Sequence, residues 1–171
     1  TPISIDHTQF LGEKLAGIAD EKAGILKKDV PCIVAEQTAI ALKQISRRAE
    51  EIGARLLQYG HAGWQAEATA EGMTVTIEGS KQIYPSPALS GPHQIGNAGL
   101  AVAVLKNLSG FEVDDKAIAT GLTTTTWPGC LQDLKHSRAA RHLPDGSELW
   151  LDGGHNAASA EVLATTLDEW Q

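Results

Sequence analysis

The sequence predicts an α/β protein, in which short apolar strands alternate with helices. Residues 3–59 pass in turn through strand, helix, strand, helix and strand patterns. The continuous apolar run at residues 31–35 is typical of a strand that is buried in a parallel sheet. Near the other end, a strand, a double-glycine turn and a helix follow one another over residues 149–170, which resembles the opening of a second α/β unit.

The first elements are predicted from apolar spacing and from the residues at their ends. Residues 3–7 indicate a short strand that ends on two polar residues. Residues 13–25 carry apolar side chains at mostly helical spacing and are followed by two lysines, which suit a helix C-terminus. Thr38 is placed to cap a second helix, which continues to Gly53. Residues 55–59 then indicate another strand.

The middle of the chain predicts a hairpin, followed by two helices. Residues 64–68 and 73–77 alternate apolar and polar side chains about a turn at 70–72. A loop follows at 84–87, and the strongly apolar segment 96–108 predicts a helix buried on most sides.

A short helix, a linker and a final strand–turn–helix unit complete the predicted elements. Asp114 or Asp115 is expected to cap the short helix, which ends near Gly121, and residues 123–129 indicate a linker. The closing strand lies at 149–152. The last helix, at 157–170, is predicted to direct one face inward; that face carries Val162, Leu163 and Leu167.

Composition excludes several classes of protein. The chain has 171 residues, with 14 basic and 21 acidic side chains, so its net charge of −7 argues against a nucleic-acid surface. No apolar stretch approaches the roughly 20 residues that cross a bilayer, and the first residues lack the pattern of a signal peptide. Cys32 and Cys130 form no disulfide framework and have no partner at metal-site spacing. We therefore expect a cytoplasmic monomer, with neither a membrane nor a nucleic acid as partner.

Polar residues gather at three places where parallel sheets commonly bind ligands, at strand ends and helix starts. Asp6-His7 with Glu21-Lys22 is either a metal site or a turn beside a solvated helix face. Residues 91–97 could hold a nucleotide base or phosphate on backbone N–H groups, or form a capped loop. In residues 152–156 an aspartate could accept ribose hydroxyls and a histidine could approach a phosphate, or the same residues could simply shape a turn.

These strings, taken in order, resemble one known family. They are Ile5-Asp6-His7-Thr8 with Leu11-Gly12, Ile18 to Ile25, Gly91-Pro92-His93-Gln94 with Asn97, Trp127-Pro128-Gly129, and Leu151 to Asn156. Over essentially the whole chain they resemble the folylpolyglutamate synthase/dihydrofolate synthase family of Mur-type ATP-dependent amide ligases. The resemblance implies that residues 1–126 form the second half of a Mur-ligase-like central ATPase domain. Residues 127–171 would begin a Rossmann-like C-terminal domain.

The resemblance also implies a chemistry and a metal site. The family phosphorylates the carboxylate of dihydropteroate or of a folate with ATP, and the amino group of glutamate then attacks the acyl phosphate. His7 would be a ligand of one Mg²⁺ ion. Lys22 would be carbamylated, which gives it the oxygen ligands that magnesium prefers. ATP and Mg²⁺ are the implied cofactors.

A nucleotide site is implied by the remaining matches. Asn97 would contact adenine, with His93 and Gln94 shaping that pocket. Asp152 would contact the ribose, and His155 would lie on the phosphate side. The predicted catalytic residues are Lys22 and His155.

Two departures from the family pattern limit what is expected of this chain. Cys130 stands where the family usually has an arginine, and a thiol cannot replace the paired hydrogen bonds of a guanidinium. No glycine-rich phosphate loop is present, and the chain begins with Thr1 rather than methionine. We therefore expect an internal segment of a bifunctional folate ligase that is inactive by itself. A peptidoglycan Mur ligase, or a nucleotide-binding module that has lost catalysis, stays open as an alternative.

Overall fold

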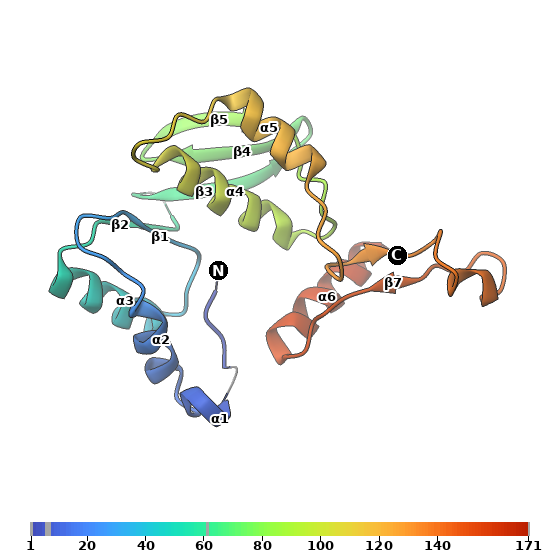
Figure 1. The fold of residues 1–171 in the computed structure, drawn as a ribbon, viewed down its shortest axis with the longest axis horizontal. Coiled ribbons are helices and arrows are strands. Elements are labelled where there is room, and N and C mark those ends of the chain that lie inside the picture. Colours follow the sequence, from blue (N-terminus) through green and yellow to red (C-terminus); the bar gives the residue numbers. More distant parts are fainter. Residues whose placement is uncertain (1, 6–7, 61, 171) are drawn as a thin grey trace.

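Two parallel strands with three helices form the first part of the computed structural model, which describes residues 2–5, 8–60 and 62–170. Strand β1 (Cys32–Val34) pairs in parallel with β2 (Leu56–Gln58). Helix α3 (Ala39–Ile52) connects these strands and packs against α2 (Leu15–Ala23), which the short α1 (Thr8–Leu11) precedes (Figure 1). The predicted order of helix, strand, helix and strand is confirmed for residues 15–58.

Local contacts explain where α3 begins and ends. The side chain of Thr38 accepts a hydrogen bond from the Ala41 N–H at 3.3 Å, as its predicted capping role requires. Gly53 ends the helix with a φ of 73°, a left-handed conformation that glycine adopts without strain. Between these ends, Ala41, Ile45 and Ala49 recur every four residues and are buried on one face of the helix.

An antiparallel sheet and two helices form the second part of the fold. Its strands are β3 (Trp64–Thr69), β4 (Gly72–Ile77) and β5 (Ser80–Tyr84), in that order. Helix α4 (His93–Lys106) crosses this sheet, and α5 (Asp115–Thr124) follows it (Figure 1). A parallel bridge between Tyr59 and Trp64 connects β2 to the start of β3. The two sheets are thus adjacent.

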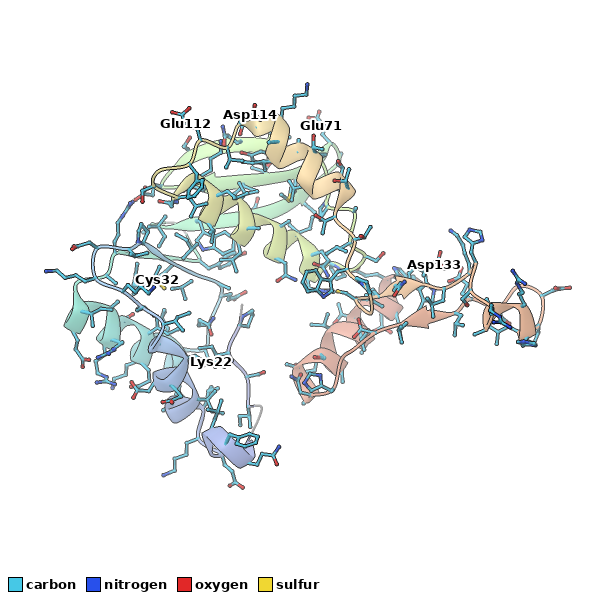
Figure 2. The ribbon with its side chains drawn as sticks, in the orientation of Figure 1. Lys22, Cys32, Glu71, Glu112, Asp114 and Asp133 are labelled. Atoms are coloured by element: carbon cyan, nitrogen blue, oxygen red, sulfur yellow. The ribbon has the colours of Figure 1, made fainter. Side chains whose placement is uncertain are left out.

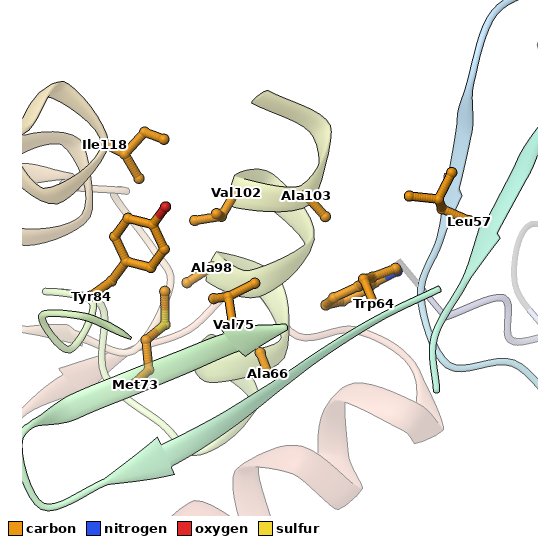
Figure 3. Packing of buried hydrophobic residues seen from close by; sticks show 10 residues of the cluster. All are labelled: Leu57, Trp64, Ala66, Met73, Val75, Tyr84, Ala98, Val102, Ala103 and Ile118. Atoms are coloured by element: carbon orange, nitrogen blue, oxygen red, sulfur yellow. The ribbon is translucent and has the colours of Figure 1, made fainter. Parts of the chain in front are cut away.

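The main hydrophobic core lies between the β3–β5 sheet and α4 (Figure 3). Trp64, Met73 and Val75 from the sheet and Val102 from α4 are each no more than 1% exposed. Leu57 of β2 joins the same cluster, which connects the parallel pair to the antiparallel sheet. This shared core holds the carboxyl end of β1 close to α4.

A polar network fastens β5 to the two helices. The Tyr84 hydroxyl donates to the Asp115 carboxylate at 2.8 Å, and Lys106 Nζ donates to the same oxygen at 2.7 Å. The hydrogen bond from Lys106, followed by that from Tyr84, lowers the pKa of Asp115. Burial, followed by the hydrogen bond to Asp115, raises the pKa of Tyr84. The network thus joins β5, α4 and α5 at one carboxylate.

A strand pair and a helix form the C-terminal part. Strand β6 (Gln132–Asp133) pairs antiparallel with β7 (Trp150–Leu151), a 3₁₀ turn at Ala140–His142 lies between them, and α6 (Ala157–Glu169) follows. Asn156 caps α6 by accepting from the Ser159 N–H at 2.9 Å. The rings of Trp150 and Trp170 lie in contact, with their centroids 4.5 Å apart. Within the described residues, no helix combines the length and apolar character needed to cross a membrane.

Several predictions about the elements are wrong or incomplete; helix α5, for example, continues to Thr124, past its predicted end near Gly121. Residues 2–5 form no strand, because the Ile3 N–H donates to the Gln37 side chain rather than to a neighbouring strand. Strand β5 was not predicted, since only its last two residues are apolar. Helix α4 begins at His93, three residues before the predicted start at residue 96. On α6 the fully buried side chain is Thr166, whereas Leu167 is 51% exposed.

The close approach of α4 to β3 requires a glycine. A Cβ atom at position 99 would lie 2.3 Å from the Cβ of Ala66 and 3.1 Å from the Trp64 ring. We expect Gly99→Ala to lower the free energy of unfolding by about 1–3 kcal/mol, because the packed core cannot admit the methyl group. Urea denaturation measures this change. Gly96→Ala on the same helix is the control, since nothing lies within 4 Å of its added Cβ; an equal loss in both variants would contradict the packing argument.

Candidate functional site

A cleft of about 720 Å³ lies between the first two parts of the fold and the C-terminal part. Its volume is within the range of small-molecule and cofactor sites. Its lining includes polar and aromatic side chains from both sides: Trp64, His93 and Asn97 from the first two parts, and Trp127, Cys130, Asp152 and His155 from the C-terminal part. The second and third predicted polar clusters therefore meet in one site, although they are distant in the sequence.

Lys22 does not line this cleft. It is exposed on α2 and lines a smaller cavity of about 370 Å³, to which Cys32 of β1 also contributes (Figure 2). The two cavities share Pro2 and Ala35, so they adjoin. The other predicted metal ligand, His7, lies outside the described residues. Within residues 2–5, 8–60 and 62–170, no group of three His, Cys, Asp or Glu side chains is placed to hold a metal ion.

The amide of Gln94 connects three residues at the cleft. Gln94 is only 4% exposed. Its Nε2 lies 2.8 Å from His93 Nε2 and donates to the Cys130 sulfur at 3.3 Å. Its Oε1 accepts from the Asn97 amide at 3.1 Å. Both ends of this buried amide are thus hydrogen-bonded, as burial of a polar group requires.

The surroundings of His93 disfavour the charged form of its imidazole. Partial burial lowers its pKa, and the negative charge of Asp152 opposes this shift. Its Nδ1 atom is buried and has no hydrogen-bond partner among the described residues. A Cβ at position 91 would lie 2.6 Å from the ring, so only Gly91 leaves room for it. The φ of Gly91, 106°, also favours glycine.

We expect His93 to make stability depend on pH. A lowered pKa in the folded state means that the unfolded chain binds the proton more tightly, so His93 favours folding least at acidic pH. As the pH falls through about 6.5, the ordinary pKa of histidine, the parent chain should lose stability relative to a His93→Gln variant. Urea denaturation of both chains at several pH values measures the difference. Parallel pH profiles of the two chains would contradict the assignment.

The carboxylate of Asp152 joins the turn before β6 to the turn that follows β7. One carboxylate oxygen accepts from the Leu131 N–H at 2.8 Å, and the other accepts from the Gly154 N–H at 2.6 Å. Leu131 has a φ of 41°, a backbone conformation that residues other than glycine rarely adopt. The hydrogen bond from its N–H to Asp152 therefore stabilises a strained turn. Asp152 therefore shapes the turn, as one interpretation of the sequence held, and also lines the cleft.

The helix starts at the cleft are already partly hydrogen-bonded. The N–H groups of Gln94 and Ile95 donate to the carbonyls of Gly91 and Pro92. This favours the capped-loop interpretation for these two groups over phosphate binding. At α6, His155 Nδ1 lies 2.9 Å from the Gly153 carbonyl, and the side chain of His155 is exposed at the cleft.

Sequence reasoning missed several residues that line the cleft. Glu36 lies two residues after the end of β1, where the preference of ligands for strand ends could have indicated its carboxylate. Trp127 is 68% exposed at the cleft, and Tyr59 makes an edge contact with Trp64. Trp127 belongs to one of the strings that carry the family resemblance, but neither aromatic residue was assigned to the site, because the position of each at the cleft depends on the packing of distant segments.

The curated proteins to which the chain is similar include dihydrofolate and folylpolyglutamate synthases. No protein-family model matches the chain. It is 35% identical over 164 residues to the probable dihydrofolate synthetase of Schizosaccharomyces pombe, covering 95% of this chain and 37% of that protein. It is 31% identical over 176 residues to the dihydrofolate synthase/folylpolyglutamate synthase of Bacillus subtilis, covering 99% of this chain and 39% of that protein.

Solved structures of folylpolyglutamate synthase/dihydrofolate synthase proteins share the fold of this chain. E. coli FolC in complex with DHPP and ADP matches with a TM-score of 0.81 and 28% identity, over 100% of this chain and 37% of that one. The bifunctional folylpolyglutamate synthase/dihydrofolate synthase of Yersinia pestis, complexed with AMPPNP and a Mn ion, matches with a TM-score of 0.78 and 28% identity, over 98% of this chain and 37% of that one. The chain thus spans less than two fifths of the length of each of these relatives.

Proposed function

We propose that this chain, a homologue of the folylpolyglutamate synthases and dihydrofolate synthases, forms the nucleotide-facing part of an ATP-dependent ligase that adds glutamate to dihydropteroate or a folate. The observation that carries the proposal is the meeting of His93, Asn97, Asp152 and His155 around one cleft. These are the residues that the family resemblance assigns to the nucleotide. We further propose that the protein acts as a monomer in the cytoplasm, with residues 1–126 and 127–171 in separate domains.

The proposed nucleotide contacts follow from the position of each group at the cleft. The Asn97 amide, oriented by Gln94, is suited to the hydrogen-bonding edge of adenine. Each carboxylate oxygen of Asp152 accepts one backbone hydrogen bond and keeps a lone pair for a ribose hydroxyl. His155 is exposed before the start of α6, where an anion is favoured by the helix dipole. The family mechanism assigns it to the phosphate side and to catalysis.

Mg²⁺ is the metal that we propose, bound by His7 and a carbamylated Lys22. The chemistry of the donor set fits only with that modification, because a protonated lysine has no lone pair and magnesium prefers oxygen ligands. Lys22 is exposed at a cavity that adjoins the cleft, so carbon dioxide can reach its amine. When bound, the ion would neutralise phosphate charge near the transferred group.

The test is an activity assay of the full gene product. We expect ATP hydrolysis and product formation that depend on glutamate and on dihydropteroate or a folate as acceptor. The same assay on the 171-residue chain alone should give no product, since the chain has no glycine-rich phosphate loop. No acceptor-dependent ATP hydrolysis by the full gene product would refute the ligase proposal. Product from the 171-residue chain would refute the second expectation.

A nucleotide-binding module without ligase activity is the second candidate. Cys130 supports it, because the thiol lies at the cleft and is hydrogen-bonded to Gln94 instead of offering a guanidinium to phosphate. ADP binding without acceptor-dependent turnover by the full gene product would favour this candidate.

A further inference from the structure

We propose that Gln94 is a positioning residue that fastens the turn at residues 127–130 to the start of α4, with the Cys130 thiol as its partner. The inference rests on the proposed function only in taking the cleft as the nucleotide site. Gln94 itself is buried behind His93 and Asn97, so it acts through its neighbours rather than on a ligand.

The side-chain amide of Gln94 makes three contacts that fix its orientation. One N–H of Gln94 is directed at His93 Nε2 and the other at the Cys130 sulfur, while its carbonyl oxygen accepts from Asn97. A thiol sulfur accepts such a bond, whereas the guanidinium of an arginine only donates. The bond from the Gln94 N–H to position 130 therefore depends on the cysteine that distinguishes this sequence from the family pattern.

The Cys130 thiol belongs to a turn that is hydrogen-bonded to the residues after β7. The Cys130 N–H donates to the Trp127 carbonyl at 3.2 Å, which closes the turn. The Gly129 carbonyl accepts from the Gly153 N–H at 2.7 Å, and the Leu131 N–H donates to Asp152. A bond at Cys130 is thus flanked on both sides by bonds to Asp152 and Gly153, the two residues that follow β7. Gln94 thereby connects α4 to the segment before β6 and, through it, to the segment after β7.

The same amide also contacts the imidazole of His93. If Gln94 donates to Nε2 of His93, that nitrogen carries no proton, and the neutral ring keeps its proton on Nδ1. The carbonyl end of Gln94 cannot turn toward His93 without losing the bond from Asn97. One buried amide therefore sets both the tautomer of His93 and the direction of Asn97.

The experiment compares the 171-residue parent with Gln94→Leu, Cys130→Ala and the control Gln44→Leu, a glutamine on α3 outside both cavities. Amide hydrogen exchange is measured at Leu131 and Gly153, beside the turn, and at Tyr59, which bonds to β1. We expect exchange at the first two amides to accelerate about three- to tenfold in both test variants, as for the loss of one hydrogen bond. Exchange at Tyr59, and all three amides in Gln44→Leu, should keep the parent rates.

Nitrogen NMR of the His93 ring gives the second readout, which a general loss of stability would not change. In the parent we expect the proton on Nδ1, and in Gln94→Glu, whose carboxylate only accepts, we expect it on Nε2. Equal acceleration at all three amides, or a parent proton on Nε2, would overturn the proposal. Should the Gln94 variants not fold, the parent ring and Cys130→Ala still decide. Neither readout uses a nucleotide, so a parallel ADP titration tests the proposed function separately.

Discussion

Replacing Trp64 with alanine is expected to lower the free energy of unfolding by about 4 kcal/mol. Trp64 is 1% exposed, and its indole N–H donates to the Val34 carbonyl of β1 at 3.0 Å. The ring also packs against α4 near Gly99 and makes an edge contact with Tyr59. The substitution therefore opens a cavity in the main core and leaves a buried carbonyl without its donor. Urea denaturation followed by circular dichroism measures the loss.

Two variants separate the causes. Trp64→Phe removes the N–H donor but keeps an aromatic ring, so we expect a smaller loss than for alanine. Trp127→Ala deletes the same side chain from a site that is 68% exposed and should change stability by no more than about 0.5 kcal/mol. Equal effects of Trp64→Ala and Trp127→Ala would show that burial at Trp64 does not hold the two sheets together.

Lys22→Ala in the full gene product is expected to reduce ATP- and glutamate-dependent synthesis by about a thousandfold or more, because a metal contributes several kcal/mol of transition-state stabilisation. Lys22→Arg should be equally inactive, since arginine keeps the positive charge but does not form the carbamate. The parent should gain the mass of one CO₂ at Lys22 in native mass spectrometry.

A neighbouring lysine provides the control. Lys27 is exposed just beyond α2 and does not line the smaller cavity, so Lys27→Ala should retain the parent rate. Near-parent activity of Lys22→Ala would remove Lys22 from the metal site. Full activity of Lys22→Arg would instead show that the residue at position 22 acts in the site without being carbamylated.

Much of the fold follows from local patterns. The apolar run that forms β1, the threonine cap of α3 and the hairpin of β3 and β4 are each encoded within a few residues, and the structure confirms them. Strand β5 escaped prediction because it lies at the edge of its sheet, where Ile83 is 60% exposed and burial imposes no apolar pattern. Helix α4 begins earlier than expected because Gly91 and Pro92 accept its first hydrogen bonds.

The candidate site was only partly predictable. Strand ends and helix starts pointed to His93, Asn97, Asp152 and His155, which the structure brings to one cleft. The bond between Gln94 and Cys130 joins positions 36 residues apart, and no spacing rule reaches that far. Likewise, the hydrogen bond that the Leu131 N–H donates to Asp152 could not be predicted. The backbone partner of a side chain depends on how two distant segments meet.

The contact between Trp150 and Trp170 gives the chain a built-in optical signal. Because the two indole rings have centroids 4.5 Å apart, we expect their excited states to couple and to produce a paired band in the ultraviolet circular dichroism spectrum. That band belongs to residues 127–171, whereas a buried indole such as Trp64 reports on the main core through its fluorescence. Coincident melting of the two signals would mean that both parts unfold as one cooperative unit, and separate transitions would mean two independent ones.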